Sequence, residues 1–332
     1  MSNLEPDPQE GVWGGRASVA AEPVRELLPG REVVLGTRAV GTSGPGPGGM
    51  VVTRTLPHRD RRMVGAWCFV DQYGPQNIAD LPGMRVPPHP HAGLHTVSWL
   101  VEGEVLHRDS LGSRQLIRPG QLGLMTAGRG IAHSEESPQD RSPLLHGVQL
   151  WVAMPDRHRH VEPDFAHHPV PPVPTDLGVM VRVLIGELDG LTSPATVYSP
   201  LVGAEATLEA GVETRLPLRP EFEYAAVTLS GSVQVDGVTV VPGTLLYLGR
   251  DRVDVTVRSE RPGRVLLLGG EPFDEQIVMW WNFVGRSHDE IVQARQDWAA
   301  GQRFGVVQGY DGDPLPAPPM PTARLKPRGR HR

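Results

Sequence analysis

The chain has 332 residues and a net charge of −6 at pH 7, and it contains 39 glycines and 34 prolines. This length exceeds the size at which one hydrophobic core usually stops growing, so we expect two domains. The acidic balance gives no electrostatic reason to expect direct binding to nucleic acid or to an anionic membrane. The glycine and proline content is typical of short strands joined by many turns, which predicts an all-β fold.

Cysteine content and the N-terminal sequence predict a cytoplasmic protein. Cys68 is the only cysteine, so no intrachain disulfide can form and a reducing compartment is the expected location. The N-terminal residues are polar and acidic, and they lack the basic start and apolar run of a signal peptide. No apolar stretch approaches the roughly 20 residues needed to span a bilayer. We therefore expect no membrane partner.

The first half of the chain predicts one β-domain. Residues 1–45 are rich in proline, glycine and charge, and they predict a flexible lead-in. Residues 63–70 are apolar and predict a buried strand. Between residues 96 and 154, strand-like runs alternate with glycine turns, so we place the first domain at residues 46–165. A proline-rich connector at residues 163–174 precedes the second half.

The second half repeats the pattern of the first. Residues 229–237 (LSGSVQVDG) echo residues 101–109 (VEGEVLHRD), and residues 241–249 echo residues 118–126. Each copy has a strand, a tight glycine turn, a second strand and a Pro-Gly corner that leads into another strand. This internal repeat of a small all-β unit predicts a second domain at residues 175–300.

The end of the chain predicts a short C-terminal helix followed by a tail. Ser287 can cap the helix, and Glu290 three residues later completes a capping box. Apolar residues recur at helical spacing up to residue 298. Residues 301–332 are proline-rich and finally basic, which predicts a solvated tail.

Two short motifs predict a metal site. His89 and His91 form one pair, and His133 and Glu135 form another, each with i, i+2 spacing. On a strand this spacing places both side chains on one face, whereas Glu136 points away. Two adjacent strands would then direct three imidazoles and a carboxylate into one pocket, and this ligand set suits iron, manganese, copper, nickel or zinc. One or two coordination positions would stay open for water, substrate or dioxygen.

The context of these pairs favours a site over chance. The chain has 13 histidines, so chance pairs are expected, and residues 158–160 (HRH) show the same spacing in a charged stretch that we interpret as surface. Prolines that stiffen the backbone frame His89 and His91, and a glycine-rich turn at residues 126–132 precedes His133. From spacing alone, metal binding and ordinary packing of these histidines both stay open.

The second copy lacks the proposed ligands. Aligning the glycine turns and Pro-Gly corners of the two copies places other residues at the four ligand positions. In the order of the ligands above they are Pro217, Arg219, Thr256 and Arg258. We therefore expect one metal-binding domain and a second domain that is structural or a lid.

Long motifs in both halves resemble pirin, a family of bicupin proteins. In the first half they are residues 89–112 (HPHAGLHTVSWLVEGEVLHRDSLG), 118–135 (RPGQLGLMTAGRGIAHSE) and 146–152 (HGVQLWV). In the second half they are residues 196–201 (TVYSPL) and 269–278 (GGEPFDEQIV). The resemblance implies two jelly-roll-like cupin barrels stacked as a bicupin, with a metal in the N-terminal barrel and none in the C-terminal barrel.

The resemblance also implies a site and an activity. The family's ligands carry over onto His89, His91, His133 and Glu135, with Fe²⁺ as the expected cofactor, although the set also accepts other divalent transition metals. The implied reaction is that of a quercetin 2,3-dioxygenase, in which dioxygen opens a flavonol and carbon monoxide and a depside are released. In this reaction Glu135 would be both a ligand and the catalytic base.

A second class of function would use the same ligands. Pirins are also described as redox-responsive iron-binding regulators of a transcription factor or a metabolic enzyme, so a protein partner stays open beside the flavonol-like substrate. A monomer would suffice, because two barrels can bury each other's faces. A structural metal is disfavoured, because closed structural sites are usually tetrahedral and rich in cysteine.

Other residues of the resembling motifs are expected near the site. His95 stands where cupins at large place a glutamate ligand, so it could supplement the ligands or line the site, and we favour lining. His107 and His146 would either orient the ligands or make ordinary hydrogen bonds. Met125 and Trp151 would form an apolar wall or belong to the core.

Overall fold

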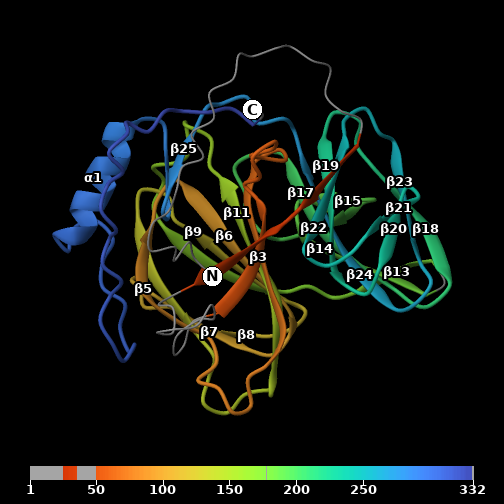
Figure 1. Cartoon of the computed structure of the whole chain (residues 1–332), viewed down its shortest axis with the longest axis horizontal. Coiled ribbons are helices and arrows are strands. Elements are labelled where there is room, and N and C mark those ends of the chain that lie inside the picture. Colours follow the sequence, from red (N-terminus) through yellow and green to blue (C-terminus); the bar gives the residue numbers. More distant parts are fainter. Residues whose placement is uncertain (1–24, 36–49, 177, 331–332) are drawn as a thin grey trace.

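Two antiparallel β-barrels lie side by side and contain most strands of the protein (Figure 1). The computed structural model describes residues 25–35, 50–176 and 178–330. Residues 1–24 of the predicted lead-in, the glycine-rich residues 36–49 and the last two residues of the predicted tail lie outside the described part. The predicted all-β architecture with two similar barrels is confirmed.

The first barrel consists of a seven-stranded sheet with the order β12-β9-β6-β11-β4-β3-β2 and a four-stranded sheet with the order β5-β10-β7-β8. Its strands are β2 (Arg31–Leu35), β3 (Met50–Leu56), β4 (Trp67–Asn77), β5 (Arg85–His91), β6 (Leu94–Glu102), β7 (Val105–Asp109), β8 (Arg114–Ile117), β9 (Gln121–Thr126), β10 (Ile131–Glu136), β11 (Leu144–Ala153) and β12 (Asp164–Pro169). Buried apolar residues from both sheets, such as Leu100 and Ile117, meet in one cluster between them.

The second barrel has the same plan, with a seven-stranded sheet in the order β1-β22-β19-β24-β17-β14-β13 and a four-stranded sheet in the order β18-β23-β20-β21. Its strands are β1 (Glu26–Pro29), β13 (Val173–Asp176), β14 (Val179–Ile185), β17 (Leu201–Leu208), β18 (Val212–Pro217), β19 (Glu223–Ser230), β20 (Val233–Val235), β21 (Val238–Val240), β22 (Thr244–Gly249), β23 (Asp254–Ser259) and β24 (Gly263–Gly270). A short hairpin of β15 (Glu187–Leu188) and β16 (Leu191–Thr192) is attached to it.

The two seven-stranded sheets pack against each other. Apolar residues from both barrels form one large buried cluster, which includes Val97 and Leu268. Buried tryptophans add polar contacts, because Trp67 Nε1 donates to the carbonyl of Gly269 at 3.1 Å and Trp99 Nε1 donates to Glu205 Oε2 at 2.9 Å. Buried polar groups need such partners, so these bonds specify how the barrels are docked.

The N-terminal lead-in differs from the prediction in its described part. Residues 26–35 form two strands, of which β1 pairs with β22 in the second barrel and β2 pairs with β3 in the first. Leu28 and Val33 are buried on these strands, and this burial offsets the cost of ordering the segment. The segment therefore connects the two barrels and is not a flexible lead-in.

The end of the chain returns to the first barrel. The hairpin of β25 (Val278–Trp280) and β26 (Phe283–Gly285) and the helix α1 (His288–Ala299) pack on its outer side (Figure 1). Leu315 N donates to the carbonyl of Pro88 at 2.8 Å, and Ala132 N donates to the carbonyl of Phe304 at 2.9 Å. Residues 301–330 are therefore not a solvated tail. Residues 278–299 were predicted to belong to the second domain (residues 175–300), but they also pack on the first barrel, whose predicted end was residue 165.

The predicted helix is confirmed. Ser287 caps α1, since its side chain accepts from Glu290 N at 3.3 Å. The Glu290 carboxylate accepts from Arg286 N at 3.0 Å, one residue before the cap. The part of the chain that the structure describes has no helix that is both long and apolar enough to cross a membrane.

Candidate metal centre

Three of the predicted ligands come together inside the first barrel. Strands β5 and β10 are antiparallel neighbours, with His133 directly opposite His89 and Ile131 opposite His91. One ring nitrogen of each of His89, His91 and His133 lies within 4.8 Å of the others, and all three side chains are buried. In the described residues, this is the single group of three or more such side chains arranged closely enough to hold an ion.

A β-bulge in β5 shifts the pairing of β5 with β10 by one residue. His133 faces His89, but Glu135, two residues later, faces Val86, so β5 has one residue more than β10 in this interval. The extra residue lies in the segment that contains Pro87 and Pro88. Proline has no N–H for a ladder, and edge strands and bulges tolerate it best. Because β5 is the edge strand of its sheet, the prolines fit here and the bulge helps to direct His89 inward.

Glu135 lies in the same interior. On β10 it alternates with Ser134 and therefore shares a face with His133. Its Oε1 accepts a hydrogen bond of 3.2 Å from Ser98 Oγ on β6 of the opposite sheet. Ser98 is also 3.1 Å from Gln149 Oε1 on β11. The carboxylate is therefore held inside the barrel from the far wall, but it is outside the close group of three imidazoles, so its role as a fourth ligand stays a prediction.

Burial keeps the three imidazoles neutral. It lowers the pKa of His89 to about 4 and lowers the pKa of His91 and His133 well below the ordinary value of 6.5. Neutral imidazole has a free lone pair on one ring nitrogen, which is the form that binds metals. The set can therefore accept a cation at neutral pH without first losing protons.

Hydrogen bonds orient each ring. The nitrogen Nδ1 of His89 donates to the carbonyl of Pro87 at 2.7 Å. His91 is hydrogen-bonded to the backbone of Asn282, between β25 and β26. His133 Nδ1 lies 3.4 Å from His107 Nδ1, and His133 Nε2 is buried without a hydrogen-bond partner among the described residues. A buried nitrogen without a partner is costly, and a metal ion would satisfy it, so the residues fit a bound cation.

His107 links the site to a carboxylate. Its Nε2 is 3.1 Å from Asp109 Oδ2, and its ring stacks on Phe165 at a centroid distance of 4.0 Å. Asp109 Oδ1 accepts from the backbone N–H groups of Leu111 and Ser113 at 2.9 and 3.0 Å. Burial alone would raise the pKa of Asp109, but the hydrogen bonds from His107 and Ser113 lower it below its usual value.

His95 and His146 are not part of the site. His95 was predicted to line it, and one of the two alternatives for His146 was that it orients the ligands. Alternation along β6 turns His95 away from Ser98 and toward the second barrel, where it stacks on Tyr198 at 5.6 Å. His146 lies at the same interface and is hydrogen-bonded to the backbone of Leu229. Both residues are buried between the barrels.

Two residues that sequence reasoning did not single out matter for the site. Ser98 is a buried polar residue of strand β6, and Asp109 ends strand β7. The signal for Ser98 was a single polar side chain within the apolar run 97–101. His107 and Asp109 have i, i+2 spacing and so share a face of β7, but the sequence does not show that this face meets His133. Trp151 faces the site, with its ring 5.2 Å from that of His91.

The second barrel fills the ligand positions with apolar side chains. Strand β20 pairs with β23 through Val235 and Val257, as β7 pairs with β10 through His107 and Glu135. This register and the pairing of β18 with β23 identify the counterparts of the four predicted ligands. The counterparts of His89 and His91 are Leu216 and Leu218, and those of His133 and Glu135 are Val255 and Val257. All four counterparts are buried. These four side chains offer no metal-binding atom, and the counterparts predicted from the sequence are displaced from them by one residue.

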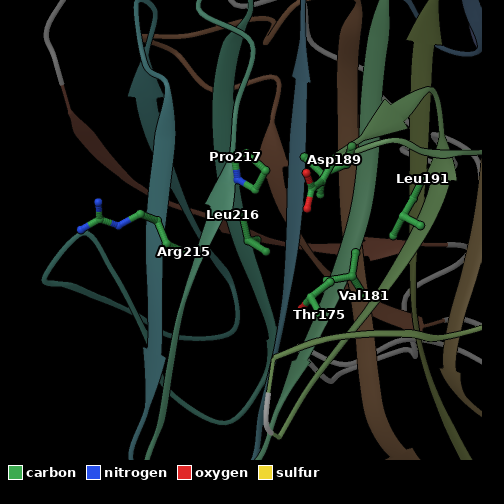
Figure 2. Close-up of a pocket in the computed structure, with 8 residues that line it drawn as sticks. Thr175, Val181, Asp189, Leu191, Arg215, Leu216 and Pro217 are labelled. Carbon is green, nitrogen blue, oxygen red and sulfur yellow. The ribbon is translucent and has the colours of Figure 1, made fainter.

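A small depression of about 80 Å³ lies on the second barrel (Figure 2). Leu216, Val181 and Leu191 line it with apolar groups, and Asp189 lies at its side (Figure 2). Arg215 extends to the opposite side of its strand from Leu216, which shows the alternation along β18 (Figure 2). Its volume is far below the roughly 300 Å³ of a typical small-molecule site.

Comparison with known families gives matches in both halves. The pirin family profile matches residues 49–152, and the profile of the pirin C-terminal cupin domain matches residues 203–305. These two segments cover the strands of the metal centre and most of the second barrel.

Relatives of known sequence or structure are similar over most of the chain. A Pseudomonas aeruginosa protein, named provisionally as a quercetin 2,3-dioxygenase, is 47% identical over 276 residues, which are 82% of this chain and 87% of that protein. A pirin-like protein of Caulobacter vibrioides is 40% identical over 82% of this chain and 95% of its own length. The crystal structure of a quercetin 2,3-dioxygenase from Acinetobacter baumannii matches with a TM-score of 0.83 and 41% identity, over 91% of this chain and 98% of that chain.

Proposed function

The chain belongs to the pirin family, and we propose that it is an iron-dependent dioxygenase of the quercetin 2,3-dioxygenase type that cleaves a flavonol-like substrate with dioxygen. The observation that carries this proposal is the buried group of His89, His91 and His133, whose ligand nitrogens lie within 4.8 Å of one another. The names of similar proteins, which include quercetin 2,3-dioxygenases, support the reaction type.

The ligand set supports a redox-active metal. We propose that His89, His91, His133 and Glu135 hold the ion, since imidazole with carboxylate suits iron and related divalent metals. Bound iron would supply the redox-active centre at which dioxygen reacts with an electron-rich phenol. All four side chains are buried, so the interior of the barrel would exclude competing water.

Glu135 is the proposed base. A flavonol must lose the proton of its 3-hydroxyl group to become electron-rich, and a carboxylate within hydrogen-bond reach of that group can accept the proton. The bond from Ser98 occupies Oε1 and restricts rotation of the carboxylate. Ser98 is itself held near Gln149, so the orientation of Glu135 is defined by two strands of the opposite sheet.

Aromatic residues beside the site fit an aromatic substrate. Trp151 stacks on Phe69 at a centroid distance of 4.0 Å, and its edge meets His91. On the other side Phe165 stacks on His107. Flat apolar walls of this kind suit a ring system that presents only a few polar groups.

The setting of the reaction follows from the same features. We propose that the protein acts in the cytoplasm, where the buried thiol of Cys68 stays reduced. We also propose that it acts as a monomer, because the large sheet of each barrel is already covered by that of the other.

The test is anaerobic reconstitution of the protein with Fe²⁺, followed by measurement of oxygen uptake and loss of quercetin absorbance. We expect metal-dependent turnover that is lost in His133→Ala. In Glu135→Gln at saturating iron, turnover should fall by roughly 10²- to 10⁴-fold, because a general base is removed. Tight iron binding without turnover on any flavonol would refute the proposed activity and favour a regulator.

A further inference from the structure

A chain of hydrogen bonds connects a turn on the first barrel to His133. The backbone N–H groups of Leu111 and Ser113 donate to Asp109 Oδ1, and Asp109 Oδ2 lies 3.1 Å from His107 Nε2. His107 Nδ1 lies 3.4 Å from His133 Nδ1. The three side chains are buried and project from adjacent positions of β7 and β10, where Asp109 faces His133 and His107 faces Glu135.

We propose that Asp109 and His107 are positioning residues that fix His133 in the tautomer with its proton on Nδ1, and so leave Nε2 free to bind the metal. The inference deepens the proposed function, because it assigns a role toward the same metal centre. It concerns where one proton is held before any ion is bound.

The direction of each bond follows from the donors available. An ionised carboxylate only accepts hydrogen bonds, so the proton between Asp109 and His107 must belong to His107 Nε2. A neutral imidazole carries one N–H, so His107 Nδ1 is then an acceptor. The bond between the two Nδ1 atoms therefore needs a proton from His133 Nδ1. His133 Nε2 keeps its lone pair, and this is the nitrogen that is buried without a partner among the described residues.

Packing and backbone hydrogen bonds hold the side chains of His107 and Asp109 in place. The ring of His107 is stacked on Phe165 with an angle of 9° between the planes, which restricts rotation of the ring. Asp109 is fixed by two amide N–H groups of its own turn. In His89 the ring proton is also held on Nδ1, but there Nδ1 donates directly to the carbonyl of Pro87. Within the described residues, the ring of His133 has no carbonyl contact of this kind, so its orientation depends on His107 and Asp109.

The variant Asp109→Asn would reverse the donor and acceptor roles in the hydrogen bonds that link residue 109, His107 and His133. The side chain would keep its size and shape. The amide oxygen must stay on the Leu111 and Ser113 N–H groups, so the amide nitrogen would face His107 and donate to its Nε2. His107 would then carry its proton on Nδ1 and donate to His133 Nδ1, which would move the His133 proton to Nε2. An asparagine in place of the triad aspartate of serine proteases acts through the same change of tautomer.

The experiment records long-range ¹H–¹⁵N correlation spectra of the metal-free full chain labelled with ¹⁵N-histidine. The signal of His133 is assigned by its loss in His133→Gln. We expect the Nδ1–H form of His133 in the wild type and the Nε2–H form in Asp109→Asn. Competition with a chromophoric chelator should show that Asp109→Asn binds Fe²⁺ roughly 10- to 100-fold more weakly, as for other partners of metal-binding histidines.

Two further variants complete the test. Asp236→Asn removes a carboxylate from the turn that follows β20 in the second barrel, where Asp236 Oδ1 accepts from Thr256 N. This variant should change neither the tautomer of His133 nor the iron affinity. His107→Phe keeps a ring against Phe165 but removes the acceptor, so the His133 proton should no longer be confined to Nδ1. This variant also serves if Asp109→Asn fails to fold.

Detection of the Nε2–H form of His133 in the wild type would overturn the proposal, and that result needs no variant. An unchanged tautomer in both Asp109→Asn and His107→Phe would also overturn it. The predicted tautomers in a protein that binds no iron would leave this inference intact and refute the proposed function, so the two failures can be told apart.

Discussion

The two barrels share one strand plan but differ in what their small sheets direct inward. In the first barrel His89 and His133 face each other across β5 and β10. In the second, Leu216 and Val255 occupy the corresponding positions of β18 and β23 and join a purely apolar cluster. The fold provides positions that point inward, and the side chains at those positions decide whether the interior offers metal-binding atoms or only apolar packing.

The two barrels also differ in the polar residues that their large sheets bury at the interface between them. Aligning the glycine turns at Gly103 and Gly231 makes His95 of β6 and Glu223 of β19 counterparts. His95 is buried with its Nε2 lacking a hydrogen-bond partner among the described residues. Glu223 is equally buried, but it accepts from Gly65 N at 2.6 Å and from the hydroxyl of Tyr247 at 2.9 Å. Substitutions in the two barrels should therefore have different consequences.

The largest expected effect comes from giving the first barrel a residue of the second. His133→Val places the counterpart side chain at the centre of the site and removes one of three clustered imidazoles. We expect iron binding to fall below detection, while the far-ultraviolet circular dichroism spectrum stays that of the wild type. The measurement is iron per chain after anaerobic dialysis. A full equivalent of iron in the variant would show that His133 is not a ligand.

The matching change in the second barrel should affect only stability. Leu216→Ala removes a buried apolar side chain and should lower the free energy of unfolding by about 2–5 kcal/mol. Urea denaturation measures this loss, and the iron content of the folded variant should match that of the wild type. Loss of iron with unchanged stability would contradict the division of roles between the barrels.

The pH dependence of stability should reveal His95, one of the buried histidines of the first barrel. Burial lowers the pKa of His95 to about 4, whereas the value in the unfolded chain is 6.5. The unfolded state therefore binds the proton first as the pH falls, and the contribution of His95 to stability is constant above pH 6.5 and is lost between pH 6.5 and 4. A shift of about 2.5 units corresponds to roughly 3 kcal/mol.

The matched variant for this test is His95→Asn, whose side-chain amide takes the position of Nδ1 and can still bond to Thr126 Oγ1. Urea unfolding at pH 7.5 and pH 4.5 should show a smaller loss of stability in the variant than in the wild type. Parallel pH profiles would mean that folding does not lower the pKa of His95.

The smallest expected effect concerns α1, which packs with β25 and β26 on the outer side of the first barrel. Ser287→Ala removes the N-cap bond to Glu290 N and should lower the free energy of unfolding by about 1 kcal/mol. Thermal or urea unfolding checks the value, and Ser287→Thr is the control that retains a capping oxygen. A loss above about 3 kcal/mol would mean that the cap supports more than the helix.

Much of the site could be predicted because alternation along a strand is local. His89 and His91, or His133 and Glu135, share a face in any regular strand, so their convergence needed only that the two strands be neighbours. The bulge in β5 could not be predicted, because it depends on how two strands distant in sequence are paired. The link from Asp109 to His133 crosses two strands and was not visible in the sequence for the same reason.

Register explains two of the errors. The glycine turns and Pro-Gly corners locate the repeat, but a shift of one residue between corner and strand moves every side chain to the other face. This is why Thr256 was aligned with His133 although Val255 is its counterpart. His95 follows Gly93, whose φ of +75° turns the chain from β5 into β6 of the other sheet, so its spacing from His91 did not define a face.

Proline content explains the error at the end of the chain. Residues 301–330 lack a periodic pattern, yet Phe304, Val307 and Leu325 are buried against the first barrel. A strand was also predicted over residues 63–70, but it begins at Trp67, because Gly65 adopts φ +52° and forms a turn before it. Burial of these segments depends on the assembled barrels and not on their own sequence pattern.

The most direct test of the difference between the barrels is a crystal structure of the iron-loaded protein with anomalous data collected at the iron edge. We predict one anomalous peak per chain, inside the first barrel and in contact with His89, His91 and His133, with Glu135 as the fourth protein ligand. A peak between β18 and β23 of the second barrel, or no peak among these residues at saturating iron, would contradict the account.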